Sequence, residues 1–99
     1  MTRDQEAQSI LKRIKADDFF LLQHADQRSQ ERGITKDNII QCAKTCFHWE
    51  WQEKHGTHFF LGSFNESEEG GFTAVLKDQV LVVTIFRRRL KQWEKNKKP

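Results

Sequence analysis

The fold is decided by residues 47–52, FHWEWQ, where aromatic and polar side chains alternate strictly. This period of two is typical of a half-buried β-strand. Upstream of this stretch, apolar residues recur at intervals of three and four, as they do on one face of a helix. Because helices precede strands, we expect an α+β fold, with N-terminal helices packed on one face of a four-stranded, mainly antiparallel sheet.

Three further strands are expected downstream, at residues 58–64, 72–76 and 80–86. They are separated by the acidic loop NESEEGG at 65–71 and by a tight turn at 77–79. The last strand, VLVVTIF, is apolar almost throughout. This predicts a central strand that is covered on both faces.

Three helices are expected upstream. The first spans residues 2–16, with Thr2 and Gln5 spaced as a capping box. A second helix, 24–32, ends at Gly33, and Thr35 caps the third. The short apolar run FFLL at 19–22 fits either a strand or a buried lead-in, because periodicity cannot separate them over four residues.

The length of 99 residues indicates a single domain, which we place at 1–86, followed by a basic extension at 87–99. Its longest uninterrupted apolar run has four residues, so we expect no membrane-spanning helix and no membrane partner. The charged N-terminus has no apolar core of a secretory signal, and two cysteines make no disulfide framework. These features predict a cytoplasmic protein.

The net charge of +3 is unevenly distributed. Residues 87–99 carry seven basic side chains and one acidic one, a net charge of +6, whereas residues 1–86 carry ten basic and thirteen acidic ones, a net charge of −3. A basic segment of this kind favours a polyanionic partner such as nucleic acid. The alternative is a tail that only aids solubility.

A row of three residues on the second helix is the main functional candidate. His24, Arg28 and Arg32 are spaced four apart, so they stack along one helix face, and we call them the His–Arg row. Arginine binds two phosphate oxygens at once, and histidine transfers protons near neutral pH. The alternative is that the arginines form surface ion pairs with Asp26, Glu31 or the acidic loop.

The run HADQRSQERGIT at 24–35 resembles the signature His-Ala-x-x-Arg-x-x-x-Arg-Gly-Ile of a small bacterial family of uncharacterised domains. The resemblance covers 19–86, so the helix at 1–16 looks like an addition. The layout of this family is similar to that of RelE-like and barnase-like toxin domains, which implies RNA cleavage and an acidic antitoxin-like partner protein. The last strand of this family often ends in Tyr, where this chain has Phe86.

The resemblance implies a toxin-like, metal-independent ribonuclease that needs no cofactor. The RNA 2′-OH would attack the adjacent phosphorus while His24 transfers a proton. Arg28 and Arg32 would hold the phosphate and stabilise its transition-state charge, with Arg87 as a further contact and Thr84 as a positioning group. The second proton-transfer residue stays open among His48, Glu50 and His58. The main alternative is a non-catalytic module that binds nucleic acid or protein.

Two other groups of residues have both functional and structural interpretations. Cys42, Cys46, His55 and His58 could be read as zinc ligands, but the cysteines fall on an apolar helix face and their spacing to the histidines is unusual, which favours core residues. The aromatic residues of 47–64 could stack on unpaired bases, yet in a small domain most of them are expected to build the core.

Overall fold

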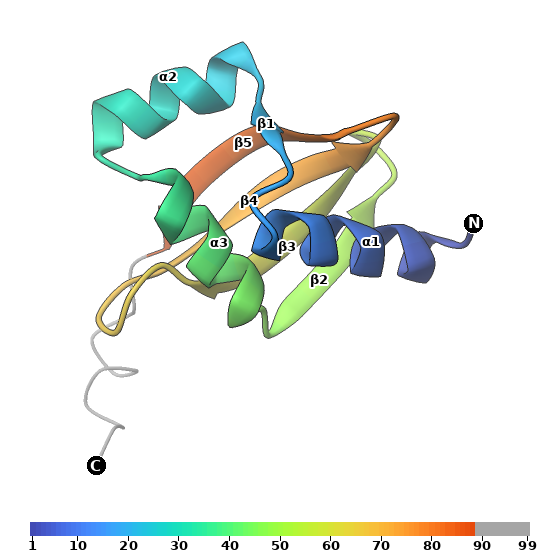
Figure 1. Ribbon diagram of the computed structural model, residues 1–99, viewed down its shortest axis with the longest axis horizontal. Helices are drawn as coiled ribbons and strands as arrows, with labels where there is room; N and C mark the ends of the chain where they lie inside the picture. Colours follow the sequence, from blue (N-terminus) through green and yellow to red (C-terminus); the bar gives the residue numbers. More distant parts are fainter. Residues whose placement is uncertain (89–99) are drawn as a thin grey trace.

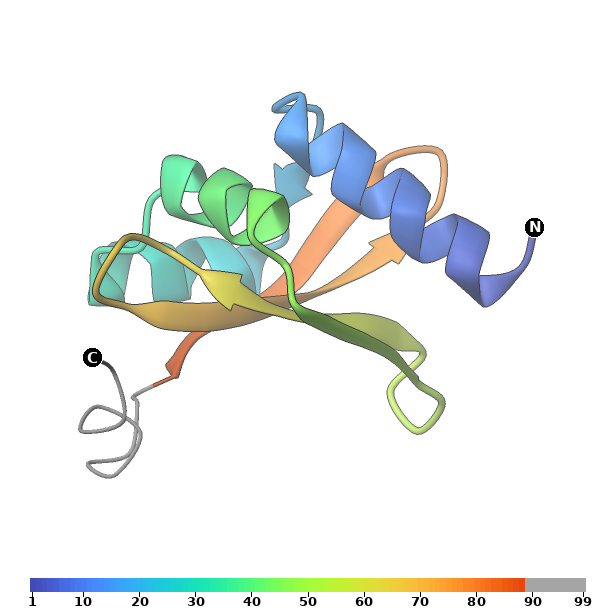
Figure 2. The same cartoon turned by 90° about the horizontal axis from the view of Figure 1, so that it is seen from below.

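The computed structural model describes residues 1–88 and has an α+β architecture, in which one mixed sheet carries helices on one face (Figure 1). The strand order is β1-β5-β4-β3-β2. Seen along the sheet, α1 and α3 lie on one side, and no helix or strand of residues 1–88 covers the other side (Figure 2). The elements are α1 (Arg3–Lys15), β1 (Phe20–Leu21), α2 (Gln23–Arg32), α3 (Lys36–Lys44), β2 (His48–Gln52), β3 (Thr57–Ser63), β4 (Glu69–Leu76) and β5 (Val80–Arg88).

The helix ends follow the capping residues of the sequence. Thr2 and Gln5 form the expected capping box before α1, and Thr35 and Asn38 form another before α3. Gly33 ends α2 in the left-handed conformation, with φ of 65°, which glycine adopts without steric cost. The expected apolar face of α1 is buried and consists of Ala7, Ile10, Leu11 and Ile14.

The sheet has five strands rather than the expected four, because the run FFLL contributes β1. Phe20 and Leu21 pair in parallel with Leu81 and Val82 of β5, whereas all other neighbouring strands are antiparallel. A parallel pair between segments 61 residues apart leaves no recognisable pattern in a strand of only two residues. The expectation of an α+β fold with a mainly antiparallel sheet is confirmed, but only α1 and α3 pack on one face, whereas α2 lies along the edge of the sheet.

Beyond the end of β1, helix α2 lies along the same edge of β5. The Leu22 N–H donates to the Val82 carbonyl (2.9 Å) just before α2 begins, and an Arg87 Nη1 donates to the Arg32 carbonyl where α2 ends. Ten helical residues span about 15 Å, and the five strand steps from Val82 to Arg87 span about 16 Å. Thus α2 runs alongside β5 and in the same direction.

The prediction that the last strand is covered on both faces is wrong. Val80, Val82 and Ile85 are buried toward the helices, but the intervening side chains are half-buried on the uncovered face. A register shift opposite Thr73 and Ala74 places an extra residue in β5 and reverses its alternation after Val82. The apolar residues of this strand therefore contribute both to the core beneath the helices and to the opposite face of the sheet.

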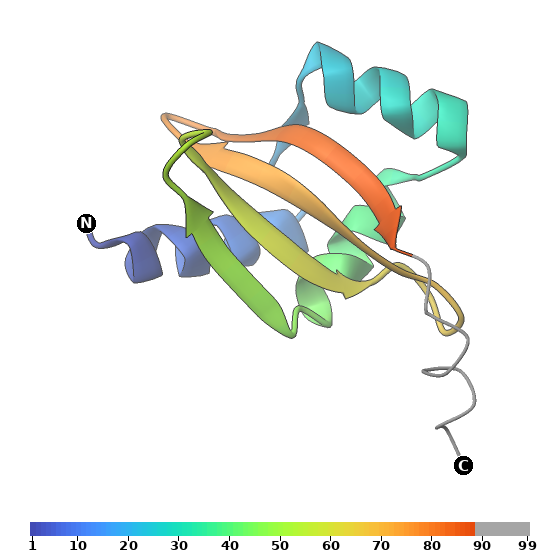
Figure 3. The same ribbon diagram turned by 180° about the vertical axis from the view of Figure 1, so that it is seen from behind.

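The two faces of the sheet each carry a pair of stacked aromatic rings. Toward the helices, Phe60 and Phe72 stack in the core with centroids 4.9 Å apart. On the uncovered face, which we call the open face (Figure 3), Phe59 stacks on Phe86 at 5.6 Å. The Phe86 ring lies over Gly71, where an added Cβ would come within 2.6 Å of it. Glycine at this position thus lets the ring cross β4 to reach Phe59.

Two expectations concern residues at or beyond the ends of strands. Phe47 lies just before β2 and is 55% exposed, so the strand pattern expected to start there begins one residue later. Strand β5 continues to Arg88, and residues 89–99 of the predicted basic extension lie outside the described part of the chain. None of the helices within residues 1–88 is long and apolar enough to cross a membrane.

Candidate functional site

The His–Arg row lies on α2, and its side chains have no polar partner among residues 1–88. His24 and Arg32 are exposed and Arg28 is half-buried. Within residues 1–88 none of the three side chains makes a hydrogen bond or an ion pair, so the expected pairing with surface carboxylates is absent there. Asp26 instead accepts a hydrogen bond from the Gln30 side chain (3.2 Å). Two unpaired guanidinium groups are therefore available to bind an anion.

The handedness of α2 turns the His–Arg row toward the open-face side of the molecule. Ala25 is fully buried and marks the side of α2 that faces β5. In a right-handed helix, His24 is rotated about 100° back from Ala25 and Arg28 about 60° back. Arg32, by contrast, is only about 20° back and points nearly as Ala25 does. His24 and Arg28 are therefore the members of the row that this rotation concerns. With α2 running beside β5 as in Figure 3, this rotation points toward the side from which the open face is seen. The row and the open face thus border the same side of β5.

Arg87 lies next to the His–Arg row but has structural partners. Its Nη1 donates to the Arg32 carbonyl, and its Nε pairs with the Glu68 carboxylate at 2.8 Å. A cation at a helix C-terminus is favourable because it faces the last free carbonyl groups. A hydrogen bond from Asn65, with Arg87 nearby, lowers the pKa of Glu68. Arg87 therefore joins α2 to the loop after β3.

Thr84 is not part of the His–Arg row. It pairs with Thr73 across β4 and β5, and both side chains lie on the open face. There they line a pocket of about 370 Å³ together with Gln52, His55, Thr57 and Val83. Of the five residues predicted to form one site, three lie on α2, Arg87 contacts the end of that helix, and Thr84 belongs to a separate pocket.

No candidate for a second proton-transfer residue is brought close to His24. His48 and Glu50 lie on β2, which is three strand spacings, or about 14 Å, from β5 on the far edge of the sheet. His58 is buried on the helix-facing side and bonds to Glu6 of α1 at 3.2 Å. The His–Arg row therefore contains one exposed imidazole without an acid–base partner from this set.

The buried His58 belongs to a cluster that joins α1 to β2 and β3. The Trp51 ring meets the His58 ring edge to face at 4.8 Å, and the Arg3 guanidinium lies 3.6 Å from the centre of the Trp51 ring. Arg3 also donates to Glu6 (2.9 Å). Hydrogen bonds from Arg3 and then from His58 lower the pKa of the Glu6 carboxyl, despite the opposing effect of burial. This cluster gives the Nε2 atom of the buried His58 a partner, whereas its Nδ1 atom is buried without one within residues 1–88.

The cysteines are placed as core residues. Cys42 is fully buried, and burial raises the pKa of its thiol to about 12. Burial also raises the pKa of Cys46, whose Sγ lies 3.4 Å from the His48 carbonyl. Within residues 1–88 no three His, Cys, Asp or Glu side chains are grouped as metal ligands. The arrangement of the described residues thus favours the core interpretation over the zinc interpretation.

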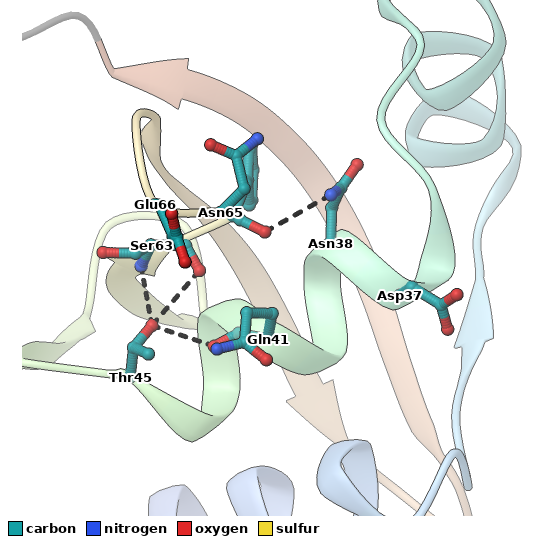
Figure 4. Close-up of a pocket in the computed structure, with 8 residues that line it drawn as sticks. Asp37, Asn38, Gln41, Thr45, Ser63, Asn65 and Glu66 are labelled. Atoms are coloured by element: carbon teal, nitrogen blue, oxygen red, sulfur yellow. Dashed lines mark hydrogen bonds between the residues drawn. The ribbon is translucent and has the colours of Figure 1, made fainter.

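A polar pocket of about 570 Å³ lies between α3 and the loop after β3 (Figure 4). The Thr45 hydroxyl donates to the Gln41 carbonyl (2.8 Å) and accepts from the Ser63 N–H (2.7 Å). Asn38 donates to the Phe64 carbonyl (3.3 Å). These polar groups satisfy one another, which indicates that they hold the loop against α3.

The pocket on the open face differs, because it includes a polar group that lacks a partner. Thr57 is 7% exposed, and its hydroxyl oxygen is buried without a hydrogen bond to any described residue. A buried unpaired hydroxyl costs about 1–3 kcal/mol. Sequence reasoning missed Thr57, Thr73 and Gln52, because threonine in a strand is expected from β-propensity alone.

The His–Arg row and the open-face pocket are the candidate sites that the geometry of residues 1–88 supports. Comparisons with protein-family models, with curated proteins and with solved structures found no match to this chain. The row offers an imidazole and two guanidinium groups that have no ion pair within the described part of the chain, and the pocket offers three hydroxyl groups, an amide and an imidazole. The described residues therefore present two candidate contact surfaces that border the same side of β5.

Proposed function

We propose that this protein is an RNA-binding domain that holds the phosphate backbone through the His–Arg row. The observation that carries this proposal is that Arg28 and Arg32 lie one turn apart on the same face of α2 with no ion pair within residues 1–88. Two guanidinium groups at this spacing suit successive phosphate oxygens. The chain as a whole has a net charge of +3, and its basic C-terminal sequence adds favourable long-range attraction.

Non-specific attraction alone is the simplest competing explanation, and the positions of the basic residues allow it to be tested against local binding by the row. The exposed lysines Lys12 and Lys44 lie on α1 and α3, on the opposite side of the sheet from the open face. If attraction were diffuse, these lysines would contribute to RNA affinity as much as the two arginines do. Local binding instead predicts that the arginines dominate.

Metal-independent RNA cleavage is a second candidate function. It is supported by His24, an exposed imidazole one turn from Arg28 and therefore placed to transfer a proton beside a bound phosphate. Efficient acid–base cleavage uses two proton-transfer groups, and His48, Glu50 and His58 lie elsewhere in the fold. Binding is accordingly the function that the geometry supports best. A toxin-like role, with an acidic protein that covers the row, belongs to this second candidate.

The test compares two variants of equal net charge. R28Q/R32Q removes the two arginines of the row, and K12Q/K44Q removes two exposed lysines. Fluorescence anisotropy with a labelled single-stranded RNA of ten nucleotides should show clear loss of affinity for the first variant and near wild-type affinity for the second. Equal loss in both variants would contradict the proposal, because it would indicate diffuse attraction.

The same RNA separates binding from cleavage. Wild-type protein and H24A are incubated with it in EDTA, and the products are resolved by gel electrophoresis. If the domain only binds, the RNA stays intact with both proteins. Cleavage by the wild-type protein that is lost in H24A would instead establish the second candidate function.

A further inference from the structure

We propose that the open-face pocket is a recognition site for an unpaired nucleobase of the RNA whose phosphates contact the His–Arg row. This inference rests on the proposed function and adds the substrate class, which is single-stranded RNA read at one base. The pocket is lined by Gln52, His55, Thr57, Thr73, Val83 and Thr84 and has a volume of about 370 Å³.

The chemistry of the lining fits the edge of a base. Hydroxyl and carboxamide groups both donate and accept hydrogen bonds. Gln52, Thr73 and Thr84 carry such groups, line the pocket and are half-buried. Unpaired bases are read through such groups and through stacking on planar side chains, which the exposed His55 imidazole offers. The side chains of the lining carry no carboxylate that would repel RNA.

Thr57 supplies independent evidence for a ligand. Its hydroxyl is buried and unpartnered within residues 1–88, although the neighbouring threonines of the pocket are half-exposed. Native structures rarely leave such a group unsatisfied. Thr57 is one of the residues that line the pocket, so a base bound there would lie beside this unpartnered group.

The pocket and the His–Arg row lie within reach of one RNA strand. Val83 and Thr84 directly follow Val82, whose carbonyl accepts the Leu22 N–H at the start of α2. His24 is two residues beyond Leu22, and the helix turns it toward the side of the open face. A phosphate at His24 and Arg28 therefore leaves the attached nucleotide beside β5, next to the mouth of the pocket.

The test measures base preference rather than affinity alone. Full-length protein is titrated with labelled ten-nucleotide homopolymers of uridine, cytidine and adenosine, using wild type, T73V/T84V and the hydroxyl-retaining control T73S/T84S. We expect the wild type to prefer one homopolymer at least tenfold. The valine variant should lose this preference while it keeps binding, and the serine variant should retain it. Thermal unfolding of each variant checks that the sheet is intact.

The outcomes separate this inference from the proposed function. RNA binding that depends on Arg28 and Arg32 but shows no base preference would contradict base recognition by the pocket. A preference that survives in T73V/T84V would do the same. Either result is compatible with phosphate binding by the row. No RNA binding by the wild type overturns both. If the valine variant does not fold, T84V alone is used with the same criterion.

Discussion

At the scale of single residues, Arg28 and Arg87 show how similar side chains beside one helix acquire different roles. Arg87 donates to the Arg32 carbonyl and pairs with Glu68, whereas Arg28 has no such partner among residues 1–88. An arginine whose donors are already used offers less to a phosphate. Arg28 is therefore the better candidate for binding, and Arg87 the better candidate for stability.

Replacing Arg87 should test this division. R87Q removes the ion pair with Glu68 and the donor to the C-terminus of α2, and we expect a loss of about 1 kcal/mol in the free energy of unfolding. Urea denaturation measures it. The salt dependence of RNA binding should stay unchanged. Unchanged stability together with weaker salt dependence would identify Arg87 as a phosphate contact, as the sequence predicts.

The Glu6 carboxyl should make stability depend on pH. Its pKa is lowered from 4.5 in the folded state by Arg3 and His58. Stability from this depressed pKa is fully present above about pH 4.5 and is lost as the pH falls through the lower folded value. Thermal unfolding should thus show a lower melting temperature for E6Q than for wild type at pH 7, and a smaller difference at pH 3. A constant difference would rule out this linkage.

Thr84 illustrates a limit of prediction at this scale. Strict alternation places it on the same face as Val82, toward the helices. The register shift beside Val83 instead puts Thr84 on the open face and Ile85 in the core. A bulge depends on pairing with the neighbouring strand and leaves little trace in one strand's own pattern. The grouping of Thr84 with the pocket therefore follows only from the assembled sheet.

At the scale of elements, helices that are fixed by nearby residues were predicted well from the sequence, and the strand that depends on distant residues was not. Thr2, Thr35 and Gly33 set helix ends through hydrogen bonds and backbone conformation within a few residues, so the sequence located all three helices. Strand β1 has two residues and exists only because β5 lies beside it. The residues of the His–Arg row followed from helical spacing, but their position beside β5 did not.

The contact between α3 and β3 depends on a glycine and yields a sharp prediction. A Cβ on Gly62 would lie 2.2 Å from the Cys42 carbonyl oxygen, which is backbone and cannot move without α3. We expect G62A to lower the free energy of unfolding by about 3 kcal/mol. G56A is the control, since its Cβ meets no atom within 4 Å and only its positive φ costs about 1 kcal/mol. Equal effects in urea denaturation would refute the packing argument.

At the scale of the whole molecule, we expect the distribution of charge along the chain to determine RNA affinity more than the net charge does. The C-terminal residues 89–99 contain five basic residues and one acidic one. Deleting them should lower RNA affinity and its salt dependence, because fewer counterions are released. The difference between wild type and R28Q/R32Q should persist in the shortened chain when binding is measured by anisotropy. Its disappearance would mean that the C-terminal residues, rather than the row, determine binding.

The most direct test of RNA binding by the His–Arg row is the salt dependence of the binding constant. The logarithm of the constant is measured against the logarithm of the KCl concentration for wild type, R28Q/R32Q and K12Q/K44Q. Each lost phosphate contact to a single strand should reduce the slope by about 0.7, so R28Q/R32Q should lose about 1.4 and K12Q/K44Q close to nothing. Identical slopes for both double variants would contradict the assignment of the row as the phosphate-binding surface.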